Sequence, residues 1–408
     1  MKKWLFFLPF LIGGPLLGQT NIGLVAYYPF NLAITDATGN TANAGFLPSP
    51  PEYGCGITGE ALAFRGGSGQ MRLSGPVKEE FDTEDFTVAF YFRVSSTDGI
   101  QYLLSKRRKD CLQDNSFYIR YRPATRNINV VLTESADRFV NIVSELEQGV
   151  CWYHVAVVRD AGNVKLYING KVAQEQSTYG RIDLRNDGDI LVGGSPCYGA
   201  NETPFKGSME ELRFYNRALP RNEVQNLAPA PPDRIATADT IVFAGNPVSL
   251  ALSSTCATTF RWSPAIGLDD PNSAAPQFSS LSPGNFSYQV QMGDAASPCV
   301  AFDSVRITVI DPNSLDCATT YLPKAFTPNG DGLNDGFGIS NPYAIQQLKS
   351  FEIFDRWGAK MFSTTNPFEQ WDGTFQGKEV NPGVMVYRVQ FTCNGEEKVN
   401  TGTFMIMK

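Results

Sequence analysis

Three acidic side chains at alternate positions could perform glycoside chemistry. Glu80, Asp82 and Glu84 would lie on one face if residues 80–84 formed a β-strand, and two such carboxyl groups can act as the acid and the nucleophile of a glycosidase. The surrounding residues are polar on both faces, however, which is more typical of a turn that leads into a strand beginning at Phe86. We therefore predict no catalytic residues and no enzymatic activity.

His154 is the only histidine of the chain. A single histidine excludes a metal site built from several imidazoles and leaves one imidazole base for any serine or cysteine triad. Apolar residues at positions 155–158 follow it and indicate a strand of the core. We therefore interpret His154 as a packed structural side chain.

Two oxygen-rich segments, residues 186–189 and 329–335, could bind calcium, because carboxylate and amide oxygens are its usual ligands. The same residue types form turns in which Asn and Asp side chains bond to the nearby backbone. Turns are the favoured interpretation of both segments, and calcium remains the one possible cofactor. The candidate ligands in the second segment are Asn329, Asp331, Asn334 and Asp335.

The first 18 residues have the pattern of a secretory signal peptide. Lys2 and Lys3 are followed by an apolar run at residues 5–12 and a small-residue end, which places cleavage between Gly18 and Gln19. Prolines and glycines interrupt the run, whereas a spanning helix needs about 20 consecutive apolar residues. No later segment is apolar enough to span a bilayer.

The mature chain is acidic. Removing Lys2 and Lys3 from 34 basic residues leaves 32 against 41 acidic residues, a formal charge of -9. Nucleic acid is therefore not an expected partner, since phosphate contacts require a basic surface. The basic run at residues 106–109 could contact an acidic polymer, but a solvated loop is the simpler interpretation.

Length and composition predict several small β domains. At about 150 residues per domain, 408 residues suggest about three domains, and 37 glycines and 26 prolines fit short strands joined by turns. A proline-rich linker at residues 228–232 and a polar boundary at residues 311–314 divide the chain. The predicted divisions are a signal peptide at 1–18 and domains at 19–228, 229–313 and 314–408.

The eight cysteines are even in number and contain no CxxC pair, so behind an export signal they indicate disulfides. If no bridge crosses a domain boundary, Cys256 pairs with Cys299 and Cys317 pairs with Cys393. The remaining four can pair in three ways, which leaves their partners open: Cys55, Cys111, Cys151 and Cys197.

The first domain alternates apolar and variable residues in runs such as 86–92 and 164–168, and the tight-turn pair Asn169 and Gly170 follows the second run. This pattern predicts a two-sheet sandwich. Four segments in order resemble the LamG-like, concanavalin A-like jelly-roll family: 86–92 (FTVAFYF), 152–156 (WYHVA), 166–171 (LYINGK) and 207–219 (GSMEELRFYNRAL).

The resemblance implies a jelly roll that binds glycans or proteins and catalyses nothing. The related laminarinase and lichenase glycosidases carry two glutamates around an aspartate with the spacing of residues 80–84. A glycoside hydrolase that uses Glu80 and Glu84 is therefore the alternative function.

The second domain contains short strands at residues 241–243, 248–252 and 286–291, with Trp262 between two cysteines. It resembles the Ig-like and PKD-type spacer modules of bacterial surface proteins. Ser297 occupies the position where antibody-type domains have a tyrosine. The expected role is that of a rigid spacer.

The third domain has the most distinctive motifs: 326–335 (FTPNGDGLND), 351–358 (FEIFDRWG), 371–374 (WDGT), 383–387 (GVMVY) and a final strand at 404–408. Together they resemble the gliding-motility-associated C-terminal domain, the type B sorting signal of the type IX secretion system. Met385 replaces the usual tyrosine and keeps a large apolar side chain on its strand face. The predicted sorting residues are Thr327, Pro328, Asn329, Gly330, Asp331, Gly332, Arg356, Trp357, Gly358, Trp371, Asp372 and Gly373.

The predicted fold is all-β, a concanavalin A-like two-sheet jelly roll followed by two small Ig-like β-sandwich domains. The resemblances imply a secreted or cell-surface protein for recognition or adhesion. Its expected partners are the type IX secretion machinery and an extracellular glycan or protein. A structural protein of the surface layer or biofilm matrix, without a specific ligand, is a further alternative.

Overall fold

The computed structural model describes residues 21–407 except 68, 83, 230, 295–296, 312–313 and 330–333. The signal peptide predicted at 1–18 lies outside these residues. The chain folds into two compact units, and the structure is all-β as predicted, with one short α-helix among the described residues, α1 (Arg221–Leu227). The first unit comprises the described residues within Met1–Ala238, Ser249–Phe278 and Ser287–Val305, and the second comprises those within Asp239–Val248, Ser279–Phe286 and Arg306–Lys408.

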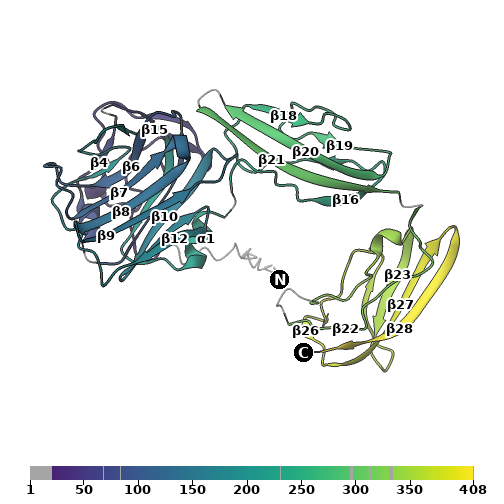
Figure 1. Ribbon diagram of the computed structural model, residues 1–408. Coiled ribbons are helices and arrows are strands. Elements are labelled where there is room, and N and C mark those ends of the chain that lie inside the picture. The colour runs from purple at the N-terminus through teal and green to yellow at the C-terminus, as the bar shows by residue number, and fades with distance from the viewer. Residues whose placement is uncertain are drawn as a thin grey trace, which may run out of the picture. The chain divides into compact units, whose positions relative to one another are not determined.

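Two sheets packed face to face form most of the first unit (Figure 1). In the sheet that we call sheet A, the strand order is β12-β11-β10-β5-β15-β3-β2, and β1 pairs with β15. Its strands are β1 (Leu24–Tyr28), β2 (Glu52–Cys55), β3 (Glu60–Arg65), β5 (Phe86–Val94), β10 (Trp152–Asp160), β11 (Asn163–Ile168), β12 (Lys171–Ser177) and β15 (Lys206–Tyr215).

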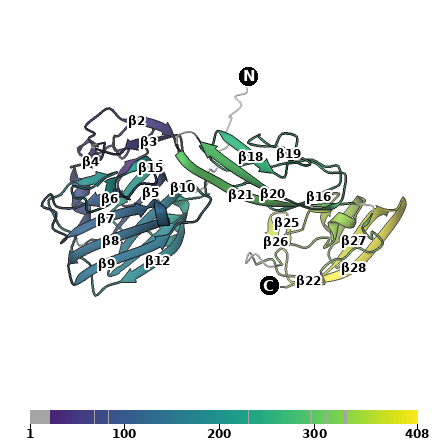
Figure 2. The same cartoon turned by 45° about the horizontal axis from the view of Figure 1, so that its top comes forward.

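Figure 2 shows β4, β6, β7, β8 and β9 of the opposite sheet, sheet B. The strand order of sheet B is β4-β13-β6-β7-β8-β9, and β14 pairs in parallel with β6. Every other pair within it is antiparallel. Its strands are β4 (Met71–Leu73), β6 (Ile100–Lys106), β7 (Ser116–Arg122), β8 (Asn127–Ser135), β9 (Arg138–Glu145), β13 (Ile190–Val192) and β14 (Glu202–Pro204).

The inner faces of the two sheets enclose the main core. Phe90 and Phe92 of β5 meet Ile119 and Tyr121 of β7 in one cluster of buried side chains. The outer face of sheet A is buried as well. Ala89, Ala156 and Tyr167 pack against helix α1, and Tyr91 and Trp152 pack beside Cys256. Strand β5 is therefore buried on both faces, as expected for a strand covered on two sides.

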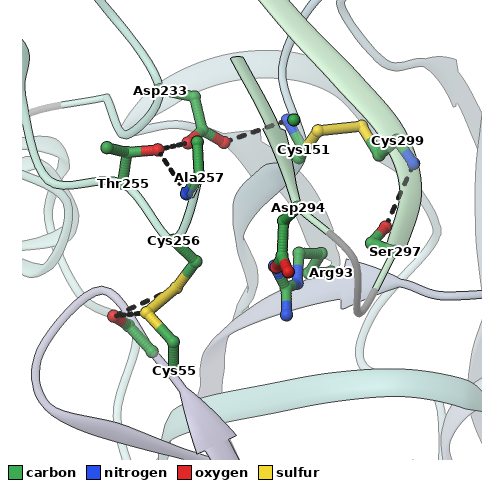
Figure 3. Close-up of polar contacts among 12 residues, drawn as sticks. Cys55, Arg93, Cys151, Asp233, Thr255, Cys256, Ala257, Asp294, Ser297 and Cys299 are labelled. Atoms are coloured by element: carbon green, nitrogen blue, oxygen red, sulfur yellow. Dashed lines mark hydrogen bonds and ion pairs between the residues drawn. A yellow bond between two sulfur atoms is a disulfide. The ribbon is translucent and has the colours of Figure 1, made fainter. Parts of the chain in front are cut away.

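Two disulfides fasten residues of the predicted second domain to sheet A (Figure 3). Cys55 at the end of β2 pairs with Cys256, and Cys151 beside β10 pairs with Cys299. The predicted Cys256–Cys299 bridge is therefore wrong. The prediction assumed independent domains, whereas the segment from Asp233 onward packs on sheet A closely enough for Cα–Cα distances of 5.7 and 5.8 Å across the bridges.

Polar contacts accompany these bridges (Figure 3). Arg93 of β5 forms a buried ion pair with Asp294, and the Ser297 hydroxyl donates to the backbone carbonyl of Val94 over 2.8 Å. The Asp233 carboxylate accepts from the Cys151 amide at 3.3 Å and from the Thr255 hydroxyl at 2.7 Å. The jelly roll and this part of the second domain thus form one cross-linked body.

Five further strands lie between residues 248 and 310 of the described chain, and β17, β20 and β21 each contain residues of both units. The Trp262 indole is buried and donates to the carbonyl of Ser273 over 2.9 Å, and the ring of Phe278 lies 5.4 Å from that of Tyr288. An Ig-like or PKD-type assignment of this region stays a prediction. The strands are β17 (Val248–Ser249), β18 (Thr259–Ser263), β19 (Gln277–Phe278), β20 (Gly284–Asp294) and β21 (Ser297–Ile310).

The second unit contains a five-stranded sheet with the order β22-β28-β27-β23-β24, a small hairpin β25-β26, and strand β16 paired in parallel with the end of β21. Its core includes Phe326, Phe337, Trp371 and Phe404. The predicted Cys317–Cys393 bridge is present. The strands are β16 (Thr240–Phe243), β22 (Ala325–Phe326), β23 (Gln347–Phe354), β24 (Lys360–Thr364), β25 (Thr374–Phe375), β26 (Lys378–Glu379), β27 (Gly383–Cys393) and β28 (Glu396–Ile406).

Strand β27 confirms the interpretation of Met385. The Met385 side chain is buried in the same core as Val389 and Phe391, two and three strand repeats further along. A methionine is unbranched and adapts to the available space, so it fills this position without a polar partner. Of the helices formed by the described residues, none is long and apolar enough to cross a membrane.

Candidate functional site

The acidic segment at residues 80–84 does not form a strand. Glu80 lies on a 3-10 helix over Pro76–Phe81, so strand alternation does not place its carboxyl group beside those of Asp82 and Glu84. Asp82 instead pairs with Arg185 at 3.0 Å. Strand β5 begins at Phe86, where the sequence predicted it. Burial raises the pKa of Glu80, and Thr83 lies outside the described residues.

His154 packs in β10 as predicted, with 1% of its surface exposed. Its ring lies 4.8 Å from the ring of Tyr91, and neither ring nitrogen has a hydrogen-bond partner among the described residues. Burial lowers the pKa of His154 to about 3, because the charged form would lose its hydration. The imidazole is therefore neutral at physiological pH.

The basic run at residues 106–109 is only partly a solvated loop. Lys106 ends β6 and is buried, with its ammonium group 3.0 Å from the carbonyl of Asn186. Arg107 is buried as well, while Arg108 and Lys109 are exposed. The prediction is wrong for the first two residues, because β6 extends through Lys106 and the chain leaves the sheet only afterwards.

The segment 186–189 contains a turn of the expected kind: the Asn186 side-chain oxygen accepts from the amide of Gly188 at 2.8 Å. In the segment 329–335 the Asp335 carboxylate accepts from the amide of Asn329 at 3.0 Å, and the carbonyl of Asn334 accepts from Thr327. Gly330, Asp331 and Gly332 lie outside the described residues. Within the part of the chain that is described, no group of three or more His, Cys, Asp or Glu residues is placed to hold a metal ion.

The remaining sorting-motif residues divide between core and surface. The Trp371 indole is buried and donates to the carbonyl of Thr374 at 2.7 Å, and the Asp372 carboxylate accepts from the Thr374 amide at 2.9 Å. In contrast, Trp357 is 76% exposed, and the Arg356 guanidinium lies 4.0 Å from its ring. The motif thus combines residues that hold the fold with residues that are available at the surface.

A cluster of aromatic and charged side chains lies on the outer face of sheet B. We call it the tyrosine–arginine cluster. On β7, Phe117 and Ile119 enter the core, so Tyr118 and Arg120 face outward. The members of the cluster are Tyr102, Tyr118, Tyr198, Arg107, Arg120 and Glu202.

Ring contacts hold the cluster together. The Tyr102 ring lies 5.6 Å from that of Tyr118 and 5.7 Å from that of Tyr198. The guanidinium groups of Arg120 and Arg107 lie 4.9 and 5.3 Å from the Tyr118 ring, which is within the range of cation–π attraction. Tyr198 remains 40% exposed, so part of this aromatic surface is open to solvent.

Hydrogen bonds fix the polar groups of the cluster. The Tyr102 hydroxyl donates to Glu202 at 3.1 Å and accepts from Arg107 at 3.2 Å. Burial raises the pKa of Tyr102 to about 12, which keeps this hydroxyl protonated. Glu202 also forms an ion pair with Arg120, and Arg120 donates to the Asn129 side chain over 3.2 Å.

A cavity of about 400 Å³ adjoins the cluster. Arg107 belongs to the tyrosine–arginine cluster and also lines the cavity. The Tyr198 hydroxyl donates to the side-chain oxygen of Gln70 in the cavity wall at 3.3 Å. The Cys111–Cys197 disulfide joins the two loops that border this region. We call this cavity the basic pocket, and its lining residues are Phe46, Pro48, Gln70, Arg72, Arg107, Lys109, Asp189, Leu191 and Pro196.

The sequence does not reveal this site, because its residues come from β4, β6, β7, β13, β14 and several loops that the fold brings together. One signal was present. Between residues 116 and 122, apolar positions alternate with Tyr118, Arg120 and Arg122. That pattern indicates a strand whose outer face is aromatic and basic.

Family comparisons define the class of the chain. Residues 65–225 match the concanavalin A-like lectin/glucanases superfamily, which confirms the predicted resemblance of the first domain. Residues 320–406 match the CHU_C type IX secretion signal domain, which confirms that of the third. The chain is therefore an exported protein of the cell surface or the medium, with a lectin/glucanase-like domain and a type IX secretion signal.

Several solved structures are similar to the chain. Domain 4 of AbnA, a GH43 extracellular arabinanase from Geobacillus stearothermophilus, solved with arabinotriose, is 22% identical over 50% of this chain and 98% of that one, with a TM-score of 0.41. The CBM40 of Ruminococcus gnavus IT-sialidase, bound to alpha2,6 sialyllactose, is 20% identical over 41% of this chain and 96% of that one, with a TM-score of 0.37. The receptor binding domain of botulinum neurotoxin D is 11% identical over 93% of this chain and 75% of that one, with a TM-score of 0.44. A search of the curated proteins found no match.

Proposed function

We propose that this chain is a non-catalytic recognition protein that binds an extracellular glycan through the tyrosine–arginine cluster and the basic pocket. The observation that supports the proposal best is the convergence of fixed polar groups with the rings of Tyr118 and Tyr198, which flank the buried Tyr102 ring on the outer face of sheet B. Aromatic faces can pack against the C–H groups of a sugar ring, while nearby donors and acceptors bond to its hydroxyls. A few oriented polar groups around an apolar surface are typical of ligand sites.

The carboxylates near the cluster have structural partners. Glu202 is held by the Tyr102 hydroxyl, the Arg120 guanidinium and the amide of Gly199. Asp189 lies 3.9 Å from Arg72 and 4.0 Å from Lys78. Glycoside hydrolysis usually requires one carboxyl group that gives up a proton and a second that attacks or activates water. The positions of these carboxylates favour a role in orienting cations over such a reaction.

The export signal gives the proposed binding its setting. A chain that carries a type IX secretion signal domain meets its ligand outside the cell. The cross-linked first unit would present the tyrosine–arginine cluster on a body of fixed geometry. Adhesion to a polysaccharide or to glycans on another cell fits both features.

A glycan array tests the proposal. The mature chain should bind a restricted set of glycans, and Tyr118→Ala should weaken the binding at least tenfold, equivalent to about 1.4 kcal/mol. Tyr179→Ala provides the matched control, since Tyr179 is fully exposed and lies outside the cluster. Absence of binding across a broad array would contradict the proposal.

A hydrolysis assay tests the non-catalytic part separately. Incubation with β-glucans should release no reducing sugar. Release that disappears in Glu80→Gln would show instead that the chain is a glycosidase.

A further inference from the structure

We infer that the glycan bound at the basic pocket is anionic and that Arg107 binds its carboxylate or sulfate group. The inference rests on the proposed function and specifies the ligand class of the same site. It follows from the charge balance around one buried guanidinium group.

Arg107 is 7% exposed, yet both of its hydrogen-bond acceptors are neutral. They are the Tyr102 hydroxyl at 3.2 Å and the carbonyl of Cys197 at 3.5 Å. Its Nε atom is buried and has no hydrogen-bond partner in the part of the chain that is described. Among those same residues, no carboxylate lies within ion-pair distance of Arg107, and Glu202 is paired with Arg120 instead.

An arginine in this position is costly for the free protein. Removing a charge from water without supplying an opposite charge is unfavourable, and buried charges are therefore normally paired. Arg107 lines the basic pocket, so a ligand that enters the pocket can supply the missing anion. A planar guanidinium forms two parallel hydrogen bonds with a carboxylate and also pairs well with sulfate oxygens.

The neighbouring charges have the same sign. Arg72 and Lys109 also line the pocket, and Asp189 carries the only carboxylate among the described residues that line it. The Asp189 carboxylate is divided between two cations, because it lies 3.9 Å from Arg72 and 4.0 Å from Lys78. Lys109 forms no ion pair among the described residues. The basic pocket is thus a positive site on a protein with a net charge of -7, an arrangement that concentrates anions locally.

The walls of the pocket favour a sugar as the carrier of the charge. Phe46 is 54% exposed beside Leu191 and Pro48, and the Arg72 guanidinium lies 4.9 Å from the Phe46 ring. A sugar ring can pack on this apolar surface while its acidic group reaches Arg107. The cations of the pocket are confined to one cavity, whereas a nucleic acid requires an extended basic surface for its phosphates.

Matched acidic and neutral polysaccharides test the inference on the mature chain. Polygalacturonate and its methyl ester form the carboxylate arm, and carrageenan and agarose form the sulfate arm. We expect calorimetry to show at least tenfold tighter binding of one acidic member than of its neutral counterpart. Arg107→Met and Lys109→Gln should each reduce that preference at least fivefold, whereas Arg108→Gln, an exposed neighbour paired with Asp110, should not change it.

Thermal unfolding without ligand adds a second readout for Arg107→Met. Because the substitution removes a buried charge that pairs with no carboxylate among the described residues, its melting temperature should equal or exceed that of the wild type. A large decrease would indicate a purely structural arginine and would contradict the inference.

The possible failures are distinguishable. Equal binding of acidic and neutral members, unchanged by Arg107→Met and Lys109→Gln, would overturn the anionic ligand and leave glycan recognition standing. The inference would also be overturned if the chain bound every polyanion equally, including DNA, and if Lys109→Gln did not reduce that binding. A chain that binds none of the polysaccharides on these arms or on the array would refute the proposed function itself.

Discussion

Replacing both Cys55 and Cys256 with alanine changes how far the chain can be stretched between its ends. A disulfide shortens the covalent path through a protein, since force passes across the bridge and not along the residues between the two cysteines. The bridge between Cys55 and Cys256 excludes 201 residues from that path. In the double variant, the bridge between Cys151 and Cys299 still excludes 148 residues.

The expected gain in length follows from these two separations. The excluded segment falls from 201 to 148 residues, a difference of 53 residues. At about 3.5 Å per fully extended residue, the variant should be about 190 Å longer than the wild type after complete unfolding. The other bridges do not affect this difference.

Single-molecule force spectroscopy of the oxidised chain, tethered at both ends, measures this length. Two control variants keep the bridge from Cys55 to Cys256. Replacing Cys111 and Cys197 with alanine, or Cys151 and Cys299, should leave the final length unchanged, because the shortest path already avoids both bridges. An unchanged length in Cys55→Ala/Cys256→Ala, or a gain in either control, would refute the pairing and the cross-linked body that it defines.

Two further predictions concern stability. Arg93→Met should lower the free energy of unfolding by about 3–5 kcal/mol, since it leaves Asp294 without this buried partner. Arg65→Met, in the exposed pair with Glu52, should lower it by less than about 1 kcal/mol. Equal losses of unfolding free energy in urea titrations of the two variants would contradict this expected difference. For His154, the pKa is about 3 in the folded chain and 6.5 without burial, so the unfolded state binds the extra proton between these values and stability falls as the pH decreases below 6.5, by about 1.4 kcal/mol per unit. His154→Phe should remove that slope, and its unfolding free energy should therefore fall about 2–3 kcal/mol less than that of the wild type between pH 6.5 and 4.5. Burial raises the pKa of Glu210 to about 7 and makes the unfolding free energy change with pH in the opposite direction. The wild type and His154→Phe share this contribution, so it cancels in their comparison. Parallel plots of unfolding free energy against pH for the two proteins would contradict the reasoning.

Local patterns predicted the elements whose geometry depends on nearby residues. The start of β5 at Phe86 and the burial of His154 follow from runs of apolar residues in the extended chain. The buried position of Met385 follows in the same way from alternation along β27. Each prediction needs only the two-residue period of a strand, which the sequence contains directly.

The failures share a different cause. The partners of Cys256 and Cys299 depend on which surface covers the outer face of sheet A, and no local pattern encodes that contact. Strand β5 contained an indirect signal, because the outward positions Ala89 and Tyr91 are apolar, whereas the solvated face of a strand is usually polar. That signal shows that something covers the sheet and does not show what covers it.

The sequence by itself determined the all-β class, the lectin-like first domain and the export signal, because each depends on a strand period or on motifs within one segment. Only the tertiary structure decided the cysteine pairing at the junction and the composition of the basic pocket. Arg107 illustrates the reason. In the sequence it is one of four consecutive basic residues, and its burial without a carboxylate exists only after β4, β6, β13 and their loops have packed together.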